Sequence, residues 1–170
     1  MFKVRIETEE DIPAVYELNR QTFNQVKEAE LVNALRKNCK DILSIVGTLD
    51  DRVVGHILFS PVVINKKKKK VAGMGLGPMA VMPDVQKQGI GTMLISAGIK
   101  ILKEKKCPFI VVLGHPGYYP RFGFEKASKH NVKSQWDVTE EAFMVLVLDR
   151  SYNGNLSGTA EYRSEFNNAV

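Results

Sequence analysis

One segment decides the fold: it runs from Leu76 to Ile95 and has the sequence LGPMAVMPDVQKQGIGTMLI. It combines the end of a strand, a loop that contains glycine, and the first turn of a helix. Gly89 and Gly91 stand two residues apart where that helix would begin. Because glycine has no side chain, backbone N–H groups can close on an anion there, and the helix macrodipole favours its negative charge. The segment therefore predicts a cradle for phosphate groups.

Two motifs resemble one known superfamily. The pattern Gln-x-x-Gly-x-Gly, formed by Gln86, Gly89 and Gly91, resembles the pyrophosphate loop of the GNAT superfamily, the acyl-CoA-dependent N-acyltransferases. A second motif, LGHPGYYPRFGF from Leu113 to Phe124, is similar to the acid-and-elbow segment of the YhbS-like branch. The resemblance covers nearly the whole chain. It implies an α/β class and a single-domain GNAT-like fold, with a mixed, mostly antiparallel sheet, helices on both faces and a parallel strand pair at the cofactor site.

Hydrophobic periodicity predicts the remaining elements. Helices are expected from near Glu10, from about Lys27 to Lys37 and from about Gln88 to Lys105. Because a helix separates Val71–Val81 from Phe109–Leu113, these two strands should be parallel neighbours with a right-handed crossover. Residues 1–150 are expected to form the N-acetyltransferase domain, and residues 151–170 a tail packed on it. The expected strands are Phe2–Glu7, Leu43–Leu49, Val53–Ile64, Val71–Val81, Phe109–Leu113, Phe122–Lys126 and Phe143–Leu148.

Composition indicates one globular domain. The chain has 170 residues, of which 44% are hydrophobic and 25% charged. Its apolar runs fall well short of the roughly 20 residues that a membrane-spanning helix needs, and the N-terminus lacks the apolar core of a signal peptide. We therefore expect a cytoplasmic protein without a membrane partner. Cys39 and Cys107 stand far apart and have no histidine at ligand spacing, so neither a disulfide framework nor a metal site is predicted.

The positive charge is concentrated in one run. Lys66 to Lys70 are five consecutive lysines, which account for the whole net charge of +5 and leave the rest of the chain neutral. Between two predicted strands, such a run favours a solvated hairpin tip, because no aromatic residues interleave it to stack bases. An acidic partner or the phosphates of a cofactor are alternative contacts. Nucleic acid is not the expected partner; a nucleic-acid module would show an affinity that falls steeply with salt.

The resemblance implies which residues bind acetyl-CoA, the expected cosubstrate. Backbone N–H groups of the loop would hold the pyrophosphate, and the side chains of Lys87 and Thr92 would add a charge or a hydroxyl contact. The pantetheine amides would pair with the backbone at the end of the preceding strand, where an N–H near Val81 would also donate to the oxyanion. The expected cofactor-binding residues are Met79, Ala80, Val81, Gln86, Lys87, Gln88, Gly89, Ile90, Gly91 and Thr92.

Tyr119 is the expected catalytic residue. It stands four residues before Gly123, where the family carries its general-acid tyrosine ahead of a Gly-Phe pair. A phenol with a pKa of about 10 is protonated at pH 7 and can donate to the departing thiolate. Two alternatives stay open: Tyr118 takes this role if the register differs by one, or both tyrosines are packing aromatics beside Pro116 and Pro120.

The general base is left open. An amine with a pKa near about 10.4 must lose a proton before it attacks, and many family members use a glutamate near the central strand. Val71 to Met82 contains no acidic or imidazole group. The remaining routes are a water chain, His56, His115, Asp84 or Glu125.

Together these features predict an N-acetyltransferase. It would move an acetyl group from acetyl-CoA to a primary amine of a small molecule or peptide by direct attack on the thioester. The missing glutamate motivates an alternative, a non-catalytic acyl-CoA-binding sensor. The amine is unknown, and the walls of its site are expected at Phe23–Ala29 and Lys126–Glu140. A homodimer is possible through an exposed strand edge near Phe143–Leu148.

Overall fold

A computed structural model describes residues 1–66 and 69–169. Lys67 and Lys68, in the middle of the predicted lysine tip, lie outside the described residues. The helices are α1 (Ile12–Phe23), α2 (Lys27–Asn38) and α3 (Ile90–Glu104). The strands are β1 (Phe2–Ile6), β2 (Leu43–Leu49), β3 (Arg52–Asn65), β4 (Lys70–Val81), β5 (Phe109–Leu113), β6 (Glu125–Lys126), β7 (Val132–Ser134), β8 (Phe143–Val147) and β9 (Gly158–Tyr162).

The strands form one mixed sheet in the order β1-β2-β3-β4-β5-β8-β6, and β9 pairs with both β3 and β7. Antiparallel pairs dominate, as in β1–β2, β2–β3 and β5–β8. β4 and β5 are parallel, from Met74 opposite Ile110 to Leu76 opposite Val112, and α3 lies between them in the chain. The predicted fold class is confirmed. A second short parallel pair, β7 with β9, was not predicted.

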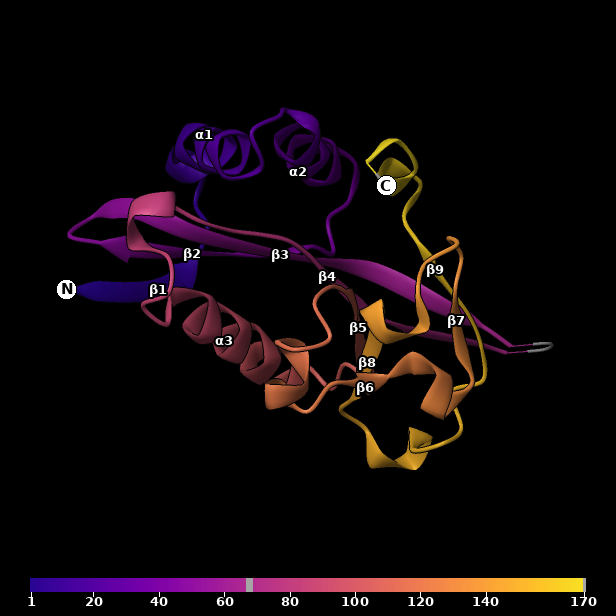
Figure 1. Cartoon of the computed structure of the whole chain (residues 1–170). Coiled ribbons are helices and arrows are strands. Elements are labelled where there is room, and N and C mark those ends of the chain that lie inside the picture. The colour runs from indigo at the N-terminus through magenta and orange to yellow at the C-terminus, as the bar shows by residue number, and fades with distance from the viewer. Residues whose placement is uncertain (67–68, 170) are drawn as a thin grey trace. The chain divides into compact units, whose positions relative to one another are not determined.

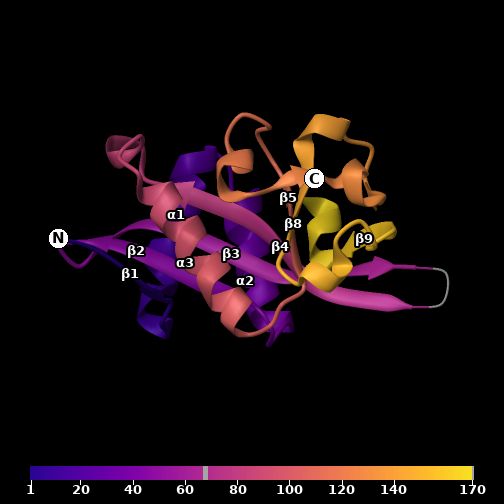
Figure 2. The same ribbon diagram turned by 90° about the horizontal axis from the view of Figure 1, so that it is seen from below.

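Contacts divide the chain into two compact units. The first unit comprises Met1–Phe59, Gly77–Lys100 and Ser164–Val170, and the second comprises Ser60–Leu76 and Ile101–Arg163. In the first unit α1 and α2 lie side by side on one face of the strands and α3 lies on the other face (Figure 1). Figure 2 shows α3 crossing in front of β2 and β3. The predicted helices on both faces are therefore present.

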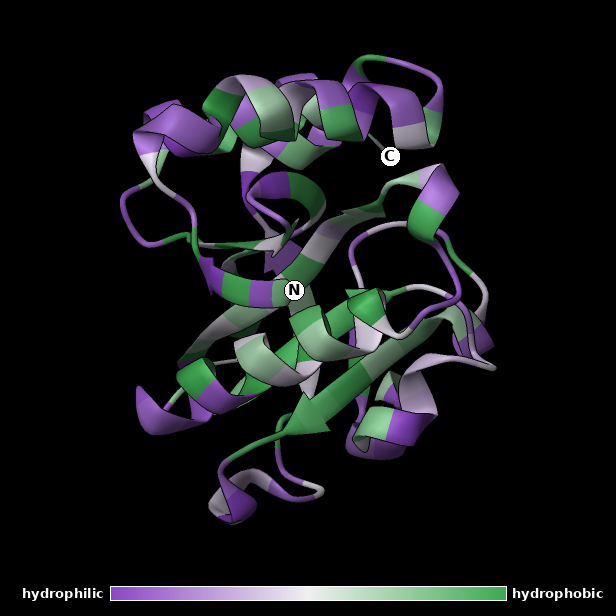
Figure 3. Cartoon of the chain, turned by 90° about the vertical axis from the view of Figure 1, so that its left-hand side faces the viewer, coloured by the Kyte–Doolittle hydropathy of each residue, from purple (hydrophilic) through white to green (hydrophobic). Residues whose placement is uncertain are grey.

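Close packing of α3 on the strands explains two glycines of the first unit. A Cβ atom at Gly55 would lie 3.0 Å from side-chain atoms of Ile90 and Leu94, and one at Gly98 would lie 2.3 Å from the Phe59 ring. Hydrophobic and hydrophilic residues alternate along β1, as Figure 3 shows beside the N label. Phe2 and Val4 are half-buried and Lys3 and Arg5 are exposed, which agrees with the predicted period of two, whereas Ile6 is exposed.

The second unit has its own apolar core, in which two glycines of β4 face aromatic rings. A Cβ atom at Gly73 would lie 2.6 Å from the Phe109 ring, and one at Gly75 would lie 2.8 Å from both Tyr162 and Val62. Glycines normally weaken a strand, but here they make room for rings. Tyr162 comes from β9, the strand that the C-terminal segment adds to the sheet.

Several boundaries differ from those expected. The strand predicted at Phe122–Lys126 is reduced to the two residues of β6, because the chain first makes a 3-10 helix, Tyr119–Phe122. β8 does not present the exposed edge that we expected near Phe143–Leu148: β5 pairs with one side, and β6 pairs with the other at Met144 and Val145. A homodimer remains a prediction without that edge.

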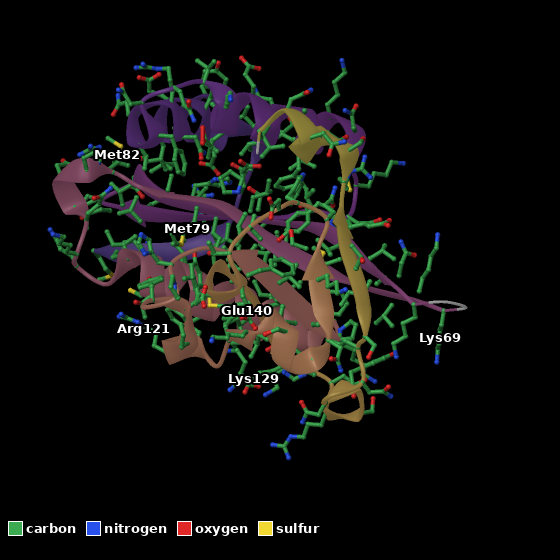
Figure 4. The ribbon with its side chains drawn as sticks, turned by 45° about the vertical axis from the view of Figure 1, so that its right-hand side comes forward. Lys69, Met79, Met82, Arg121, Lys129 and Glu140 are labelled. Atoms are coloured by element: carbon green, nitrogen blue, oxygen red, sulfur yellow. The ribbon has the colours of Figure 1, made fainter. Side chains whose placement is uncertain are left out.

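The lysine run lies at a hairpin between β3 and β4. Lys66 and Lys69 exchange backbone hydrogen bonds of 2.9 and 3.4 Å, and Lys69 is exposed. Figure 4 shows the Lys69 side chain extending away from the ribbon. Lys69 and Lys70 are thus exposed, as a solvated tip requires, whereas Lys66 is half-buried and its Nζ donates to the Asn155 carbonyl oxygen. Within residues 1–66 and 69–169, no helix has the length and apolar character to cross a membrane.

Candidate functional site

The predicted phosphate cradle connects β4 to α3 in the first unit. After β4 the chain makes a 3-10 turn, Pro83–Val85, which is anchored by the buried side chain of Val85. Gln86 then closes the loop, because its side-chain amide donates to the carbonyl oxygen of Val81 (2.9 Å). Residues 86–89 are exposed, whereas Ile90 is buried. The loop is therefore fixed by Val85 and Gln86 at its start and by the buried Ile90 at its end, and the residues between them are exposed to solvent.

The backbone of this loop turns left-handed at two residues. Lys87 and Gly89 both adopt left-handed conformations, with φ of 63° and 86°. A positive φ is uncommon outside glycine, and a Cβ atom at Gly89 would meet no atom within 4 Å. The Met93 N–H donates to the Gly89 carbonyl (3.1 Å), which is the first i-to-i−4 hydrogen bond of α3. The N–H groups of Ile90, Gly91 and Thr92 come before this bond and so have no carbonyl partner within the helix. They are available to an anion at the positive end of the helix dipole.

The last residues of β4 lie directly before the loop. The register with β5 ends at Leu76, whereas β4 continues to Val81. Met79, Ala80 and Val81 therefore lie beyond the part of β4 that pairs with β5. Ala80 is buried and its two neighbours are half-buried, and Figure 4 shows Met79 on the strand with Met82 just beyond it. All ten predicted cofactor-binding residues thus lie on one continuous strand-loop-helix segment of the first unit.

Tyr119 lies in the second unit, at the start of the 3-10 helix Tyr119–Phe122. Its side chain is 8% exposed and its ring is held edge-on by Tyr118 and Phe124, with centroids 5.2 and 5.7 Å away. Burial, with a smaller contribution from Tyr118, raises the pKa of Tyr119 to about 12. The hydroxyl is therefore protonated at neutral pH and suited to donate a proton rather than to accept one.

Tyr118 occupies a different environment. Its ring is half-buried, and the guanidinium of Arg121 lies 4.6 Å from the ring centroid. Arg121 also donates from Nε to the backbone carbonyl of Tyr118 (3.0 Å). Through these two contacts Tyr118 binds Arg121 of the 3-10 helix, which favours a packing role for Tyr118.

His56 is a poor candidate for the general base. It is fully buried; Asn19 Nδ2 approaches its Nδ1 (3.3 Å) and Ser44 Oγ approaches its Nε2 (2.9 Å). Asn19 Nδ2 also donates to the Val15 carbonyl, which fixes Nδ2 as donor and places the imidazole proton on Nε2. Burial, with a contribution from Arg36, lowers the pKa of His56 to about 3. A neutral imidazole that is buried and has protein partners at both nitrogens has a structural role and is not available as a base.

The other base candidates differ in their partners. His115 is exposed on the loop that follows β5. Asp84 lies 3.6 Å from Arg52, and Glu125 lies 3.3 Å from the buried His130. Among the described residues, no group of three or more His, Cys, Asp or Glu side chains is placed to hold a metal ion. Of the histidines that the sequence proposed as bases, only His115 is open to solvent.

Comparison with protein families and curated proteins gives consistent matches. Residues 3–127 match the model of the acetyltransferase (GNAT) domain. The chain is 36% identical over 166 residues to the uncharacterized N-acetyltransferase YhbS of Escherichia coli K12, covering 96% of this chain and 98% of that protein. It is 35% identical over 126 residues to YjhQ of the same organism, another uncharacterized N-acetyltransferase, covering 73% of this chain and 70% of YjhQ.

Solved structures show the same similarity in three dimensions. The crystal structure of Escherichia coli YhbS in complex with CoA superimposes with a TM-score of 0.91 at 34% identity, covering 98% of this chain and 92% of that chain. A GNAT acetyltransferase from Brucella melitensis in complex with acetyl-CoA gives a TM-score of 0.80 at 32% identity, covering 98% and 99%. The fold of this chain is therefore also that of proteins crystallised with CoA or acetyl-CoA.

Proposed function

Because the chain belongs to the GNAT family of acetyltransferases, we propose that it moves an acetyl group from acetyl-CoA to a primary amine of a small molecule or peptide. The amine nitrogen attacks the thioester carbonyl directly, the carbon–sulfur bond breaks, and CoA leaves as the thiolate. The observation that carries the proposal is the exposed loop before α3, where Lys87 and Gly89 both have left-handed backbone conformations.

The loop fits the pyrophosphate of acetyl-CoA. Gly89 is exposed and has open space where a side chain would be, so phosphate oxygens can approach the backbone. We assign the pyrophosphate contacts to the N–H groups of residues 87–92, with the exposed side chains of Lys87 and Thr92 as further donors. Gln86 contributes by holding the loop against Val81.

The strand before the loop supplies backbone groups for the rest of the cosubstrate. An extended pantetheine arm carries amides, and strand backbone pairs with amides as it does with a neighbouring strand. We assign this role to Met79, Ala80 and Val81, whose backbone lies outside the β4–β5 register. A backbone N–H near Val81 is the proposed oxyanion donor, a group whose loss typically costs about 10²–10³ in rate.

Proton handling divides between two groups. Tyr119, with its raised pKa, is the proposed general acid that protonates the departing thiolate. The incoming amine must lose a proton, and the burial of His56 favours water or the exposed His115 as its route. This assignment gives the acid role to a buried tyrosine in an aromatic cluster and leaves the base role to water or His115.

Release of free CoA in the presence of acetyl-CoA and a panel of primary amines tests the proposal. We expect CoA release that depends on the amine and an acetylated amine of the corresponding mass. Binding of acetyl-CoA without CoA release across the whole panel would instead support the acyl-CoA-binding sensor. The Gly89→Gln variant should abolish binding, because its side chain extends into the space above the helix N-terminus.

A further inference from the structure

The second unit contains the only Asn-Gly pair of the chain, Asn153 and Gly154. Both residues are exposed and lie between the 3-10 helix Arg150–Tyr152 and β9. Asparagine is most prone to deamidation when glycine follows it, because a residue without a side chain leaves its nitrogen unhindered and its backbone free to turn. The pair is therefore a chemically reactive site that the proposed acetyl transfer does not use.

Deamidation begins when the backbone nitrogen of Gly154 loses its proton to hydroxide and attacks Cγ of Asn153. The new carbon–nitrogen bond closes a succinimide ring, the bond from Cγ to Nδ2 breaks, and the departing nitrogen takes a proton from water and leaves as ammonia. Water then opens the ring at either carbonyl, which leaves aspartate or isoaspartate at position 153. The reaction needs no other partner, but the Gly154 nitrogen must reach Cγ.

The backbone of Asn153 holds that nitrogen away from the side chain. Its φ is −57° and its ψ is 120°. At this ψ the carbonyl oxygen of Asn153 lies nearer to its Cβ atom than the Gly154 nitrogen does, because oxygen and nitrogen lie on opposite sides of the carbonyl carbon. Ring closure therefore requires a large rotation about the Cα–C bond of Asn153. That rotation turns the peptide plane that carries the Gly154 N–H.

Three hydrogen bonds oppose this rotation. The Gly154 N–H donates to Nδ1 of His130 (3.2 Å). The N–H groups of the residues on either side, Asn153 and Asn155, donate to carbonyl groups of the preceding 3-10 helix (3.1 and 2.9 Å). Of the three bonds, the one to His130 holds the reacting nitrogen itself.

The surroundings of His130 favour this bond. Its side chain is buried, and its carbonyl accepts from the Ser157 N–H (3.2 Å), so the loop is attached to His130 at a second point. Because the Gly154 N–H is a donor, Nδ1 must be the unprotonated nitrogen and Nε2 carries the proton. Nε2 faces Oε1 of Glu125 (3.3 Å), which accepts that proton's hydrogen bond. Glu125 thus stabilises the tautomer that can accept from Gly154.

We propose that Asn153 is a latent deamidation site that His130 holds unreactive in the folded protein. Opening of the loop releases the Gly154 nitrogen from His130 and permits ring closure. The reaction replaces a neutral amide with a carboxylate, and the isoaspartate product adds a methylene group to the backbone before β9. The proposal involves the second unit alone and does not depend on acetyl transfer.

Peptide mapping by mass spectrometry tests the site. Trypsin cleaves after Arg150 and Arg163 and so releases residues 151–163, in which Asn155 precedes leucine and serves as an internal control. Folded protein and protein in urea are incubated at neutral pH and compared with unincubated samples. In urea we expect aspartate and isoaspartate at position 153, formed at least about tenfold faster than in the folded protein, because the opposing hydrogen bonds are lost.

This comparison uses the wild type alone, so it does not depend on the folding of any variant. Equal rates in the two states would overturn the protection of Asn153 by the fold. A urea sample without isoaspartate at position 153 would overturn the site itself.

Variants then assign the protection to His130. In the folded protein His130→Ala should accelerate deamidation roughly fivefold, the factor that corresponds to the loss of one ordinary hydrogen bond. His130→Asn is the matched variant and should keep most of the protection, because its Oδ1 can accept the Gly154 N–H as Nδ1 does. Gly75→Ala crowds the same unit at another place and controls for general destabilisation. No acceleration in His130→Ala, or equal acceleration in Gly75→Ala, would contradict the role of His130.

Discussion

The ring of Tyr119 packs on Gly114 so closely that a Cβ atom at Gly114 would lie 2.4 Å from its Cε2 atom. The ring cannot move away easily, because Tyr118 and Phe124 hold it edge-on from other sides. The position of the proposed acid therefore depends on a neighbour that has no side chain.

Gly114→Ala should lower kcat while leaving acetyl-CoA affinity unchanged. The added methyl group must displace the Tyr119 ring, and a shift of about 1 Å in a catalytic group can cost up to about 100-fold in rate. Steady-state kinetics and calorimetry measure the two quantities. Gly117→Ala is the matched control in the same loop, because a Cβ atom there would meet nothing within 4 Å. Equal effects of the two substitutions would contradict this account of Gly114.

Tyr119→Phe removes the proposed acid without changing the ring packing. We expect kcat to fall by about 10²-fold or more, within the range typical of general acids, with no loss of acetyl-CoA binding. Tyr118→Phe should have a small effect, since its contacts use the ring and the backbone carbonyl. A larger loss of rate in Tyr118→Phe than in Tyr119→Phe would move the acid role to Tyr118.

The raised pKa of Tyr119 predicts the form of the pH–rate profile. A general acid works in its protonated form, so its contribution is present below its pKa and is lost as pH rises through about 12. We therefore expect no alkaline decline of kcat between pH 7 and roughly 10, where an unperturbed tyrosine would begin to ionise. A decline near pH 9 that disappears in Tyr119→Phe would show that burial does not raise this pKa.

His56 should make stability dependent on pH on the acid side of neutrality. Its pKa is lowered to about 3 in the folded protein, whereas an exposed histidine titrates near about 6.5. Below the unfolded pKa the unfolded chain binds more protons, so the free energy of unfolding is highest above it and falls as pH drops towards 3. The loss between pH 6.5 and 5 should be about 2 kcal/mol.

Urea denaturation at pH 7.5 and pH 5 measures this loss. Below about pH 4, Asp11 adds a second contribution, because its hydrogen bond to Arg5 lowers its pKa to about 2. The window between pH 6.5 and 5 therefore reports on histidine. Imidazole NMR resonances give an independent readout: those of His56 should not titrate above pH 5, and titration near 6.5 would contradict its burial as a neutral group.

Gly75→Ala should destabilise the second unit. The new methyl group would lie 2.8 Å from both Tyr162 and Val62, and overpacking of this kind typically costs about 1–3 kcal/mol. Thermal denaturation measures the change, and Gly117→Ala again serves as the control with free space. An unchanged melting temperature would show that Tyr162 can move away from β4 at little cost.

Local patterns predicted most of the fold. The period of two predicted β1, and two neighbouring apolar segments predicted β2 and β3. In the turn between them, Asp50 and Asp51 have φ of 50° and 66°, values that aspartate tolerates in tight hairpins. The helix expected from near Glu10 is α1, which begins at Ile12 after the acidic 3-10 turn Glu9–Asp11 and has Pro13 in its first turn. These features depend on neighbours in sequence, so the sequence alone could reveal them.

Features that depend on distant partners could not be predicted. β7 and β9 are three and five residues long, and each is stabilised by pairing with a strand far away in the chain. The free edge expected near Phe143–Leu148 was wrong because β6, only two residues long, pairs there. Nothing local marks His56 as buried, since its environment comes from Asn19 and Ser44 on other elements.

At the candidate site, the sequence located the loop but not its shape. The glycines and the helix start predicted an anion cradle, whereas the left-handed backbone of Lys87 and the contact from Gln86 to Val81 emerge only in three dimensions. A pocket beside Trp136 takes most of its walls from Lys126–Glu140, the segment expected to form part of the acceptor wall, and Phe143 of β8 completes its lining.

Calorimetric titration with acetyl-CoA tests the central claim most directly. Wild-type protein and Gly89→Gln would be titrated with acetyl-CoA, with desulfo-CoA and ATP as ligand controls and Gly117→Gln as the protein control. We predict saturable binding of acetyl-CoA and desulfo-CoA by the wild type and Gly117→Gln, no comparable binding of ATP, and none of acetyl-CoA by Gly89→Gln. Absence of acetyl-CoA binding by the wild type, or unchanged binding by Gly89→Gln, would contradict the assignment of the loop before α3 as its pyrophosphate site.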